Sequence, residues 1–171
     1  IVMSRQRYLI KENGDWIEYE HMRDVENHFF TYLYDHHLYR PGNNMRNYMK
    51  AEITIAGGRG IKKVKDFCLL NALAYYLDAE IGISRPLADQ GCFSRELQIG
   101  INGRKISSDL YIAIGISGKF QHMVGLRDVK RLMAININKK AEIFENADFG
   151  IVGDYKEIIS SFLQTLTKLS R

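Results

Sequence analysis

The chain has few cysteines and no long apolar run. Its two cysteines, Cys68 and Cys92, have neither the spacing of a metal site nor that of a redox pair, and we therefore expect a reducing, cytoplasmic location. No run of about 18 apolar residues is present, so we expect no membrane insertion. The first residues lack the charged-then-apolar plan of a signal peptide.

The chain also lacks a strong charge of one sign. The net charge is +4 over 171 residues, and no basic stripe with interleaved aromatic residues is present, so we expect no nucleic-acid partner. A few arginines that face a bound phosphate would account for a surplus of this size. The length fits one domain with a small appendage.

The composition changes near Lys50, and we divide the chain into residues 1–50 and residues 51–171. The first part holds four of the five histidines and six of the ten tyrosines, whereas the second is richer in Gly, Ile and Ala. The aromatic residues of the first part could form a dimer interface or a cap over a ligand. We favour the simpler interpretation that they complete a core.

The first part predicts a hairpin and a helix. Residues 8–12 and 16–19 flank Asn13-Gly14, a strong tight-turn pair. A helix is expected over residues 23–34, and the turn-rich residues 40–44 indicate a linker.

The second part alternates short apolar strands with helical segments. Strands are expected at residues 53–56, 79–83, 110–114, 132–135 and 149–152, and helices at residues 64–77, from about 119, and 154–169. Near-continuous apolar strands that alternate with helices indicate an α/β fold with a parallel sheet covered on both faces.

The most informative motif follows the strand at residues 110–114. Residues 115–122 form a small-residue turn that opens a helix, with free backbone N–H groups, the Ser117 hydroxyl and the His122 imidazole. Free amides at a helix start bind phosphate and other anions. The signal is moderate by itself, because many α/β domains have such a turn, and His122 is about as consistent with a structural role as with facing ligand charge.

Other candidate residues also follow the ends of predicted strands, where open α/β sheets bind nucleotides. They are the turn at residues 57–60 with Arg59, the segment at residues 84–86, Asn136 and Asp154. Each has a plainer interpretation, as a tight turn, a loop with a surface arginine, or a helix cap.

Three local conformations can also be predicted near these residues. Pro86 disfavours a helical conformation for Arg85. Residues 98–103 contain two glycines and an Asn-Gly pair, which indicates a turn or hairpin. Asp148 and Asp154 could both cap helices.

Together these motifs make residues from about 51 to 168 resemble the C-terminal FAD-binding domain of the electron transfer flavoprotein alpha subunit. The motifs, in the family's order, are Ala56-Gly57-Gly58-Arg59-Gly60, Ile83-Ser84-Arg85-Pro86, Gln98-Ile99-Gly100, Leu110-Tyr111-Ile112-Ala113, Gly115-Ile116-Ser117-Gly118 with Gln121-His122, Ala134-Ile135-Asn136, and residues 147–154. The resemblance implies a doubly wound, mostly parallel sheet of the Rossmann-like nucleotide-binding kind. Residues 1–50 would then be a small hairpin and helix appendage.

The resemblance also implies roles for individual residues. Arg59, Ser84 and the Ser117 turn would face the FAD pyrophosphate and its linker, Asn136 the phosphate–ribitol region and Asp154 the adenosine end. Arg85 would lie against the isoalloxazine, and His122 would face its C2 carbonyl. The implied cofactor-binding residues are Arg59, Ser84, Arg85, Gln98, Ile99, Gly100, Ile101, Asn102, Ser117, Gly118, Lys119, Phe120, Gln121, His122, Asn136, Asp154 and Tyr155.

The sequence departs from the family at several of these positions. Ile101 and Asn102 stand where the family usually has Gln-Thr, and Lys119 and Phe120 replace alanine and isoleucine. The first fifty residues are also too few for the family's N-terminal domain. We therefore expect a minimal relative, or a protein whose missing part another chain supplies.

Two functions follow from the resemblance and these departures. The first is an FAD-binding electron carrier that shuttles electrons between a dehydrogenase and an acceptor, with redox partner proteins and either a beta-type subunit or a second copy of itself. The alternative is a nucleotide-binding module for FAD, AMP or NAD without electron transfer. No nucleophile–base pair supports an enzyme, and no metal site is expected.

Overall fold

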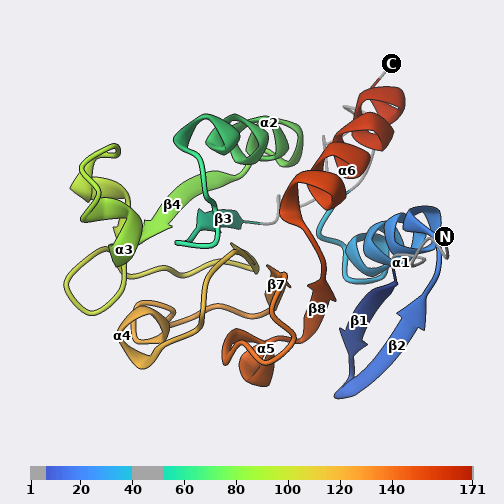
Figure 1. Ribbon diagram of the computed structural model, residues 1–171, viewed down its shortest axis with the longest axis horizontal. Coiled ribbons are helices and arrows are strands. Elements are labelled where there is room, and N and C mark those ends of the chain that lie inside the picture. The colour runs from blue at the N-terminus through green and yellow to red at the C-terminus, as the bar shows by residue number, and fades with distance from the viewer. Residues whose placement is uncertain (1–6, 40–51, 171) are drawn as a thin grey trace, which may run out of the picture.

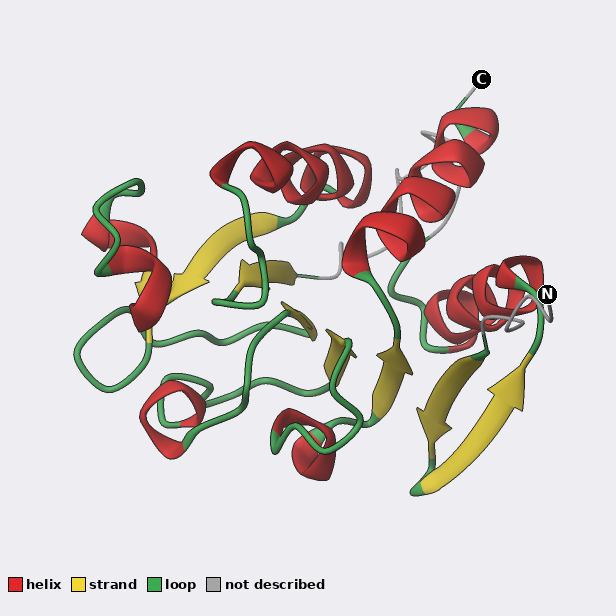
Figure 2. Ribbon diagram, in the orientation of Figure 1, coloured by secondary structure: helices red, strands yellow, loops and turns green. Residues whose placement is uncertain are grey.

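The fold is built on one eight-stranded sheet with helices on both faces (Figures 1 and 2). The computed structural model describes residues 7–39 and 52–170. The strands are β1 (Tyr8–Glu12), β2 (Asp15–Tyr19), β3 (Ile53–Gly57), β4 (Glu80–Ser84), β5 (Gln98–Ile99), β6 (Leu110–Ile114), β7 (Leu132–Asn136) and β8 (Phe149–Val152). The helices are α1 (Met22–Asp35), α2 (Phe67–Leu77), α3 (Arg85–Ala88), α4 (Phe120–Met123), α5 (Ile143–Asn146) and α6 (Tyr155–Leu169), with 3-10 turns at Val64–Asp66 and Arg95–Leu97.

The order of the strands positions the functional site. The sheet runs β2-β1-β8-β7-β6-β3-β4-β5, and β3 to β8 pair in parallel. From β3 the chain proceeds outward through β4 and β5, and from β6 it proceeds the other way through β7 and β8. The direction of winding therefore reverses between β3 and β6, which is where open α/β sheets bind ligands.

Alternate side chains of β3, β6, β7 and β8 enter two separate cores. On β6, Ile112 packs in the core that contains α1, α2 and α6, whereas Tyr111 and Ala113 pack in the core that contains α5. Figure 1 shows these two groups of helices on opposite sides of the sheet. The predicted doubly wound, mostly parallel α/β fold is confirmed. Within the described residues, no helix combines the length and the apolar character needed to span a membrane.

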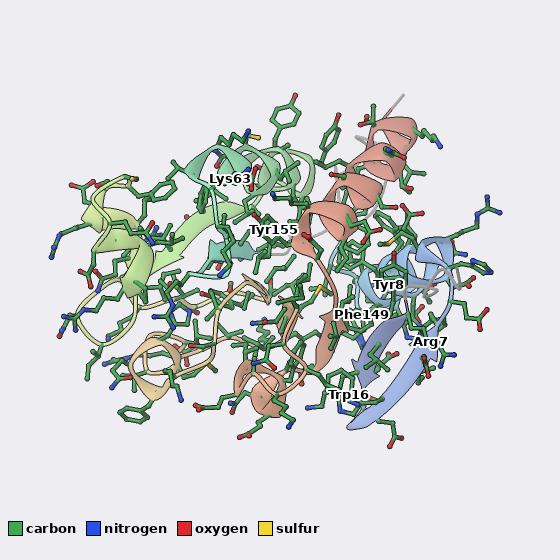
Figure 3. All side chains as sticks on the ribbon, in the orientation of Figure 1. Arg7, Tyr8, Trp16, Lys63, Phe149 and Tyr155 are labelled. Carbon is green, nitrogen blue, oxygen red and sulfur yellow. The ribbon has the colours of Figure 1, made fainter. Side chains whose placement is uncertain are left out.

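The N-terminal hairpin extends the same sheet. Its turn residues Asn13 and Gly14 have φ angles of 52° and 89°, as a tight hairpin turn requires, and β1 pairs antiparallel with β8. Helix α1 packs on α6 through stacked rings of Phe29 and Phe162, whose centroids lie 3.9 Å apart. In Figure 3 the hairpin residue Trp16 points toward α5, and its ring centroid lies 5.3 Å from that of Phe144.

These contacts mean that aromatic residues of the first part do complete a core. The division of the chain near residue 50 stays a prediction. The predicted linker at residues 40–44 lies outside the described residues.

One local prediction near the site was wrong. Arg85 is helical, as the first residue of α3, and its carbonyl accepts the Asp89 N–H at 2.9 Å. Pro86 is tolerated there because the first N–H groups of a helix have no intrahelical acceptor. The turn predicted within residues 98–103 is confirmed, because the Gly103 N–H donates to the Gly100 carbonyl at 3.1 Å. Only Gln98 and Ile99 differ from the prediction, since they form a short strand against β4.

A second local prediction, that Asp148 caps a helix, was also wrong. The Asp148 carboxylate accepts the Leu132 N–H at 2.8 Å, and thereby joins the beginnings of β7 and β8. Two short helices, α3 and α5, were not predicted, because four residues are too few to show a helical period.

Candidate functional site

A cleft of about 740 Å³ lies at the carboxyl ends of the parallel strands. Loops that follow β3, β4, β5, β6 and β7 all contribute to it, and it covers the point where the winding of the sheet reverses. The lining residues are Arg59, Gly60, Lys62, Ser84, Arg85, Pro86, Gln98, Ile99, Gly100, Ile101, Gly115, Ile116, Ser117, Lys119, Gln121, His122, Asn136, Asn138, Lys140, Ala141 and Glu142.

The cleft brings together most of the predicted cofactor-binding residues. Arg59, Ser84, Arg85, Gln98, Ile99, Gly100, Ile101, Ser117, Lys119, Gln121, His122 and Asn136 all line it. Asn102, Gly118, Phe120, Asp154 and Tyr155 do not.

Glycines allow the loops after β3 and β6 to meet at the floor of the cleft. The Gly58 N–H donates to the Ile114 carbonyl, and the Gly60 N–H donates to the Gly115 carbonyl, both at 2.9 Å. A Cβ on Gly58 would lie 2.4 Å from the Gly115 carbonyl oxygen, which no ordinary side chain permits. This close approach holds the Arg59 loop beside the turn that carries Ser117.

Ser84 presents a buried hydroxyl at the end of β4. The residue is 5% exposed, and its Oγ has no hydrogen-bond partner among the residues the structure describes. A buried polar atom without a partner is costly. Because Ser84 lines the cleft, a polar group of a bound ligand would satisfy it.

His122 presents a second buried polar group, from α4. The side chain is 7% exposed, and its Nε2 lies 2.8 Å from the Tyr111 hydroxyl. Burial lowers the pKa of His122 to about 4, and the nearby Ile99 backbone opposes part of this change. The imidazole is therefore neutral near pH 7. No hydrogen bond of normal geometry forms at Nδ1 within the described part of the chain.

Basic side chains outnumber acidic ones in the cleft. Among the residues that the structure describes, Arg59, Lys62, Arg85, Lys119 and Lys140 line it, together with one carboxylate, that of Glu142. Two of these cations have acidic partners: Lys119 forms an ion pair with Glu142, and Arg85 lies 3.4 Å from an Asp89 oxygen. The surplus suits an anionic ligand.

Asn136 connects two loops of the site. Its Nδ2 donates to the Ile116 carbonyl at 2.9 Å, and its Oδ1 accepts the Asn138 N–H at 2.9 Å. The amide thus fixes the end of β7 against the turn after β6. A backbone hydrogen bond from Ile143 to Ser117, 2.9 Å long, joins the same two loops.

Sequence reasoning missed several cleft residues, including Lys62, Asn138 and Lys140. They lie in loops, where no periodic pattern exists. Their only signal is nearness in sequence to Arg59 and Asn136, each of which follows a predicted strand.

The predicted residues outside the cleft hold local structure. The Asp154 carboxylate accepts the Lys156 N–H at 2.8 Å and caps α6. Tyr155, at the start of α6 in Figure 3, donates its hydroxyl proton to Asp66 at 2.8 Å. Gly118 has a φ of +85°, and a Cβ there would meet the Ile143 nitrogen at 2.3 Å. Asn102 and Phe120 are exposed.

Comparison with known proteins points to one family. Residues 47–127 match the family model described as the electron transfer flavoprotein FAD-binding domain. The alpha subunit of the mitochondrial electron transfer flavoprotein of Oryza sativa subsp. indica is 40% identical over 116 residues, which is 68% of this chain and 32% of that protein.

Two further relatives give similar values. The electron transfer flavoprotein alpha subunit of Mycobacterium leprae is 42% identical over 112 residues, or 66% of this chain and 35% of that protein. The mitochondrial electron transfer flavoprotein alpha subunit of Dictyostelium discoideum is 40% identical over 118 residues, which is 69% of this chain and 33% of that protein. The chain therefore spans about a third of the length of these curated relatives.

Proposed function

We propose that this chain, which carries the FAD-binding domain of the electron transfer flavoprotein alpha family, binds FAD in the cleft and transfers electrons through it. The observation that carries the proposal is the pair of buried polar groups in the cleft. Ser84 Oγ has no partner among the described residues, and His122 Nδ1 has no hydrogen bond of normal geometry there, only an interaction with the Ile99 backbone. A ligand would supply a partner.

The residues of the cleft fit FAD in three respects. The cleft volume of about 740 Å³ is within the usual range for ligand pockets, about 300–1,000 Å³. The surplus of basic side chains matches the charge of a pyrophosphate. The orphaned polar groups of Ser84 and His122 suit a ligand with polar atoms along its length.

The proposed roles follow the position of each residue. Arg59 and the backbone amides of the Ser117 turn would bind the pyrophosphate, and the Ser84 hydroxyl would donate to the linker. Asn136 would hold these loops at the phosphate–ribitol region. Arg85 and His122 would lie at the isoalloxazine end. We retain the adenosine contact of Asp154 only as a prediction, because its carboxylate already caps α6.

When bound, FAD supplies a ring system that accepts and donates electrons, and the protein adjusts the energy of that change. Arg85 is permanently charged, so its guanidinium favours the added negative charge of the reduced state. His122 is neutral near pH 7 because it is buried, and it can therefore donate one hydrogen bond without bringing a competing charge into the cleft.

This chemistry describes a carrier and not an enzyme. We propose that electrons pass from a dehydrogenase to an acceptor protein, and that a beta-type subunit or a second copy of the chain completes the assembly. The cytoplasmic location expected from the cysteines stays a prediction.

One observation favours the alternative function, a nucleotide-binding module without electron transfer. Ile101 lines the cleft with an apolar side chain, and the neighbouring Asn102 amide does not line it. The chain thus lacks, at this edge, the polar side chains that the family usually places there. In that case AMP would stabilise the protein as well as FAD does, and no flavin would be retained.

A redox titration of the FAD-loaded protein tests the proposed function. Arg85→Ala should lower the midpoint potential of the bound flavin, because a positive charge that favours reduction is lost. Arg95→Ala is the matched control: Arg95 also lies near Asp89, at 3.7 Å, but does not line the cleft. An unchanged potential in Arg85→Ala would contradict the role of this residue, and failure to load FAD would favour the alternative.

A further inference from the structure

We propose that Tyr111 is a positioning residue for the cleft: its hydroxyl fixes the tautomer of His122 with the proton on Nδ1. The consequence for ligand binding rests on the proposed function. The tautomer itself is a property of the chain without any ligand, so the two can be tested separately.

Tyr111 is held rigidly below the cleft. It is the second residue of the central strand β6, pairs with Thr54 of β3 and Leu132 of β7, and is fully buried at 0% exposure. Its hydroxyl oxygen lies 2.8 Å from His122 Nε2. Since Tyr111 does not itself line the cleft, it can act on a ligand only through His122.

The positions of the tyrosine and imidazole protons decide which of the two groups donates in the hydrogen bond between Tyr111 and His122. Burial raises the pKa of Tyr111 well above its usual value, so the hydroxyl keeps its single proton. If Nε2 were protonated, it would donate to the Tyr111 oxygen, and the tyrosine proton would be left buried without an acceptor in the described structure. That arrangement is costly. The tyrosine therefore donates, Nε2 accepts, and the imidazole proton resides on Nδ1.

The assigned tautomer has a consequence for the site. A histidine in water prefers the proton on Nε2, so Tyr111 reverses the ordinary preference. The Nδ1–H group is then a donor directed at the Ile99 backbone, which interacts with the imidazole and opposes part of the lowering of its pKa. Ile99 and His122 both line the cleft, so a ligand would share this donor with the Ile99 carbonyl. A ligand acceptor at this edge, such as a ring carbonyl, would meet a donor and not a lone pair.

Nitrogen-15 NMR of the histidine-labelled chain tests the proposal without ligand. The His122 signals are assigned by their loss in His122→Gln. We expect a protonated Nδ1 and an unprotonated Nε2 in the wild type near pH 7, and a shift toward the Nε2–H form in Tyr111→Phe. A protonated Nε2 in the wild type, or an unchanged tautomer in Tyr111→Phe, would overturn the proposal.

Two features keep the test decisive. Should Tyr111→Phe not fold, the wild-type spectrum alone still supports or overturns the assignment. Tyr76→Phe is the matched control, because its hydroxyl lies 3.0 Å from Thr167 Oγ1 and outside the cleft. It removes one hydroxyl and should leave the His122 signals unchanged.

A fluorescence titration with FAD then measures the effect on the ligand. Losing one correctly placed neutral donor should weaken binding by about 2- to 10-fold in Tyr111→Phe, and Tyr76→Phe should bind as the wild type does. Equal affinities of Tyr111→Phe and wild type would overturn the role toward the ligand. If the wild type does not bind FAD, the proposed function fails, while the tautomer experiment still decides the assignment.

Discussion

Ser84→Ala should make the chain without ligand slightly more stable and its complex with FAD weaker. The hydroxyl is buried at 5% exposure without a partner among the residues described. Alanine removes this unsatisfied group and takes away very little volume. The same change removes a hydrogen bond that we propose forms only when the ligand is bound.

The expected magnitudes follow from the cost of an unpaired hydroxyl. A buried polar group without a partner costs about 1–3 kcal/mol, part of which is offset by the small cavity that alanine leaves. We expect a gain of about 0–2 kcal/mol in the unfolding free energy of the unliganded chain. The lost ligand hydrogen bond is worth about 0.5–1.5 kcal/mol, which weakens FAD binding by about 2- to 12-fold.

Thermal unfolding with and without FAD measures both effects, since about 1 kcal/mol shifts the midpoint of a domain of this size by about 2–4 °C. Ser108→Ala is the matched control, because its Oγ is also buried and unpartnered but does not line the cleft. It should stabilise the chain similarly and leave the effect of FAD unchanged. The reasoning is refuted if Ser84→Ala destabilises the unliganded chain and binds FAD with wild-type affinity.

Three further predictions concern stability. The folded chain protonates His122 only below about pH 4, whereas the unfolded chain protonates it below about pH 6.5. The unfolding free energy should therefore rise between pH 4 and pH 6.5. Denaturant titrations of His122→Gln should show a rise that is smaller by about 3 kcal/mol. Gly58→Ala should lose about 1–3 kcal/mol of unfolding free energy in chemical denaturation, because its Cβ would meet the Gly115 carbonyl. Gly153→Ala should lose less, because the one close neighbour of its Cβ is the flexible end of Ile158, with Tyr8 at ordinary contact distance; equal losses would contradict the loop contact. Asp154→Ala should cost about 1 kcal/mol and Asp154→Asn little, as expected for a helix cap, whereas weaker FAD binding by Asp154→Asn would place the carboxylate on the ligand.

Much of the sheet could be predicted from sequence because its strands are apolar on both faces. All five residues of β6 are buried, and such a run has few alternatives to a parallel strand. The order of the strands could not be predicted in the same way. Periodicity shows which face of a segment is buried but not which segment lies beside it, and β1 pairs with β8 from the opposite end of the described chain.

The failures near the site have local causes. Arg85 is helical because the first turn of α3 does not need the N–H that Pro86 lacks. For Asp154 the predicted helix cap is confirmed, and its contact with a ligand stays a prediction. The pairing of Tyr111 with His122 spans eleven residues and joins a strand to a helix, so no spacing rule would have shown it.

The most direct test of the account is whether FAD binds in this cleft. The purified chain is incubated with FAD and desalted, and its visible absorption spectrum is recorded for the wild type and for Ser84→Ala. The account predicts flavin bands that stay with the wild-type protein as a one-to-one complex and are weaker for the variant. A colourless wild-type protein would contradict it.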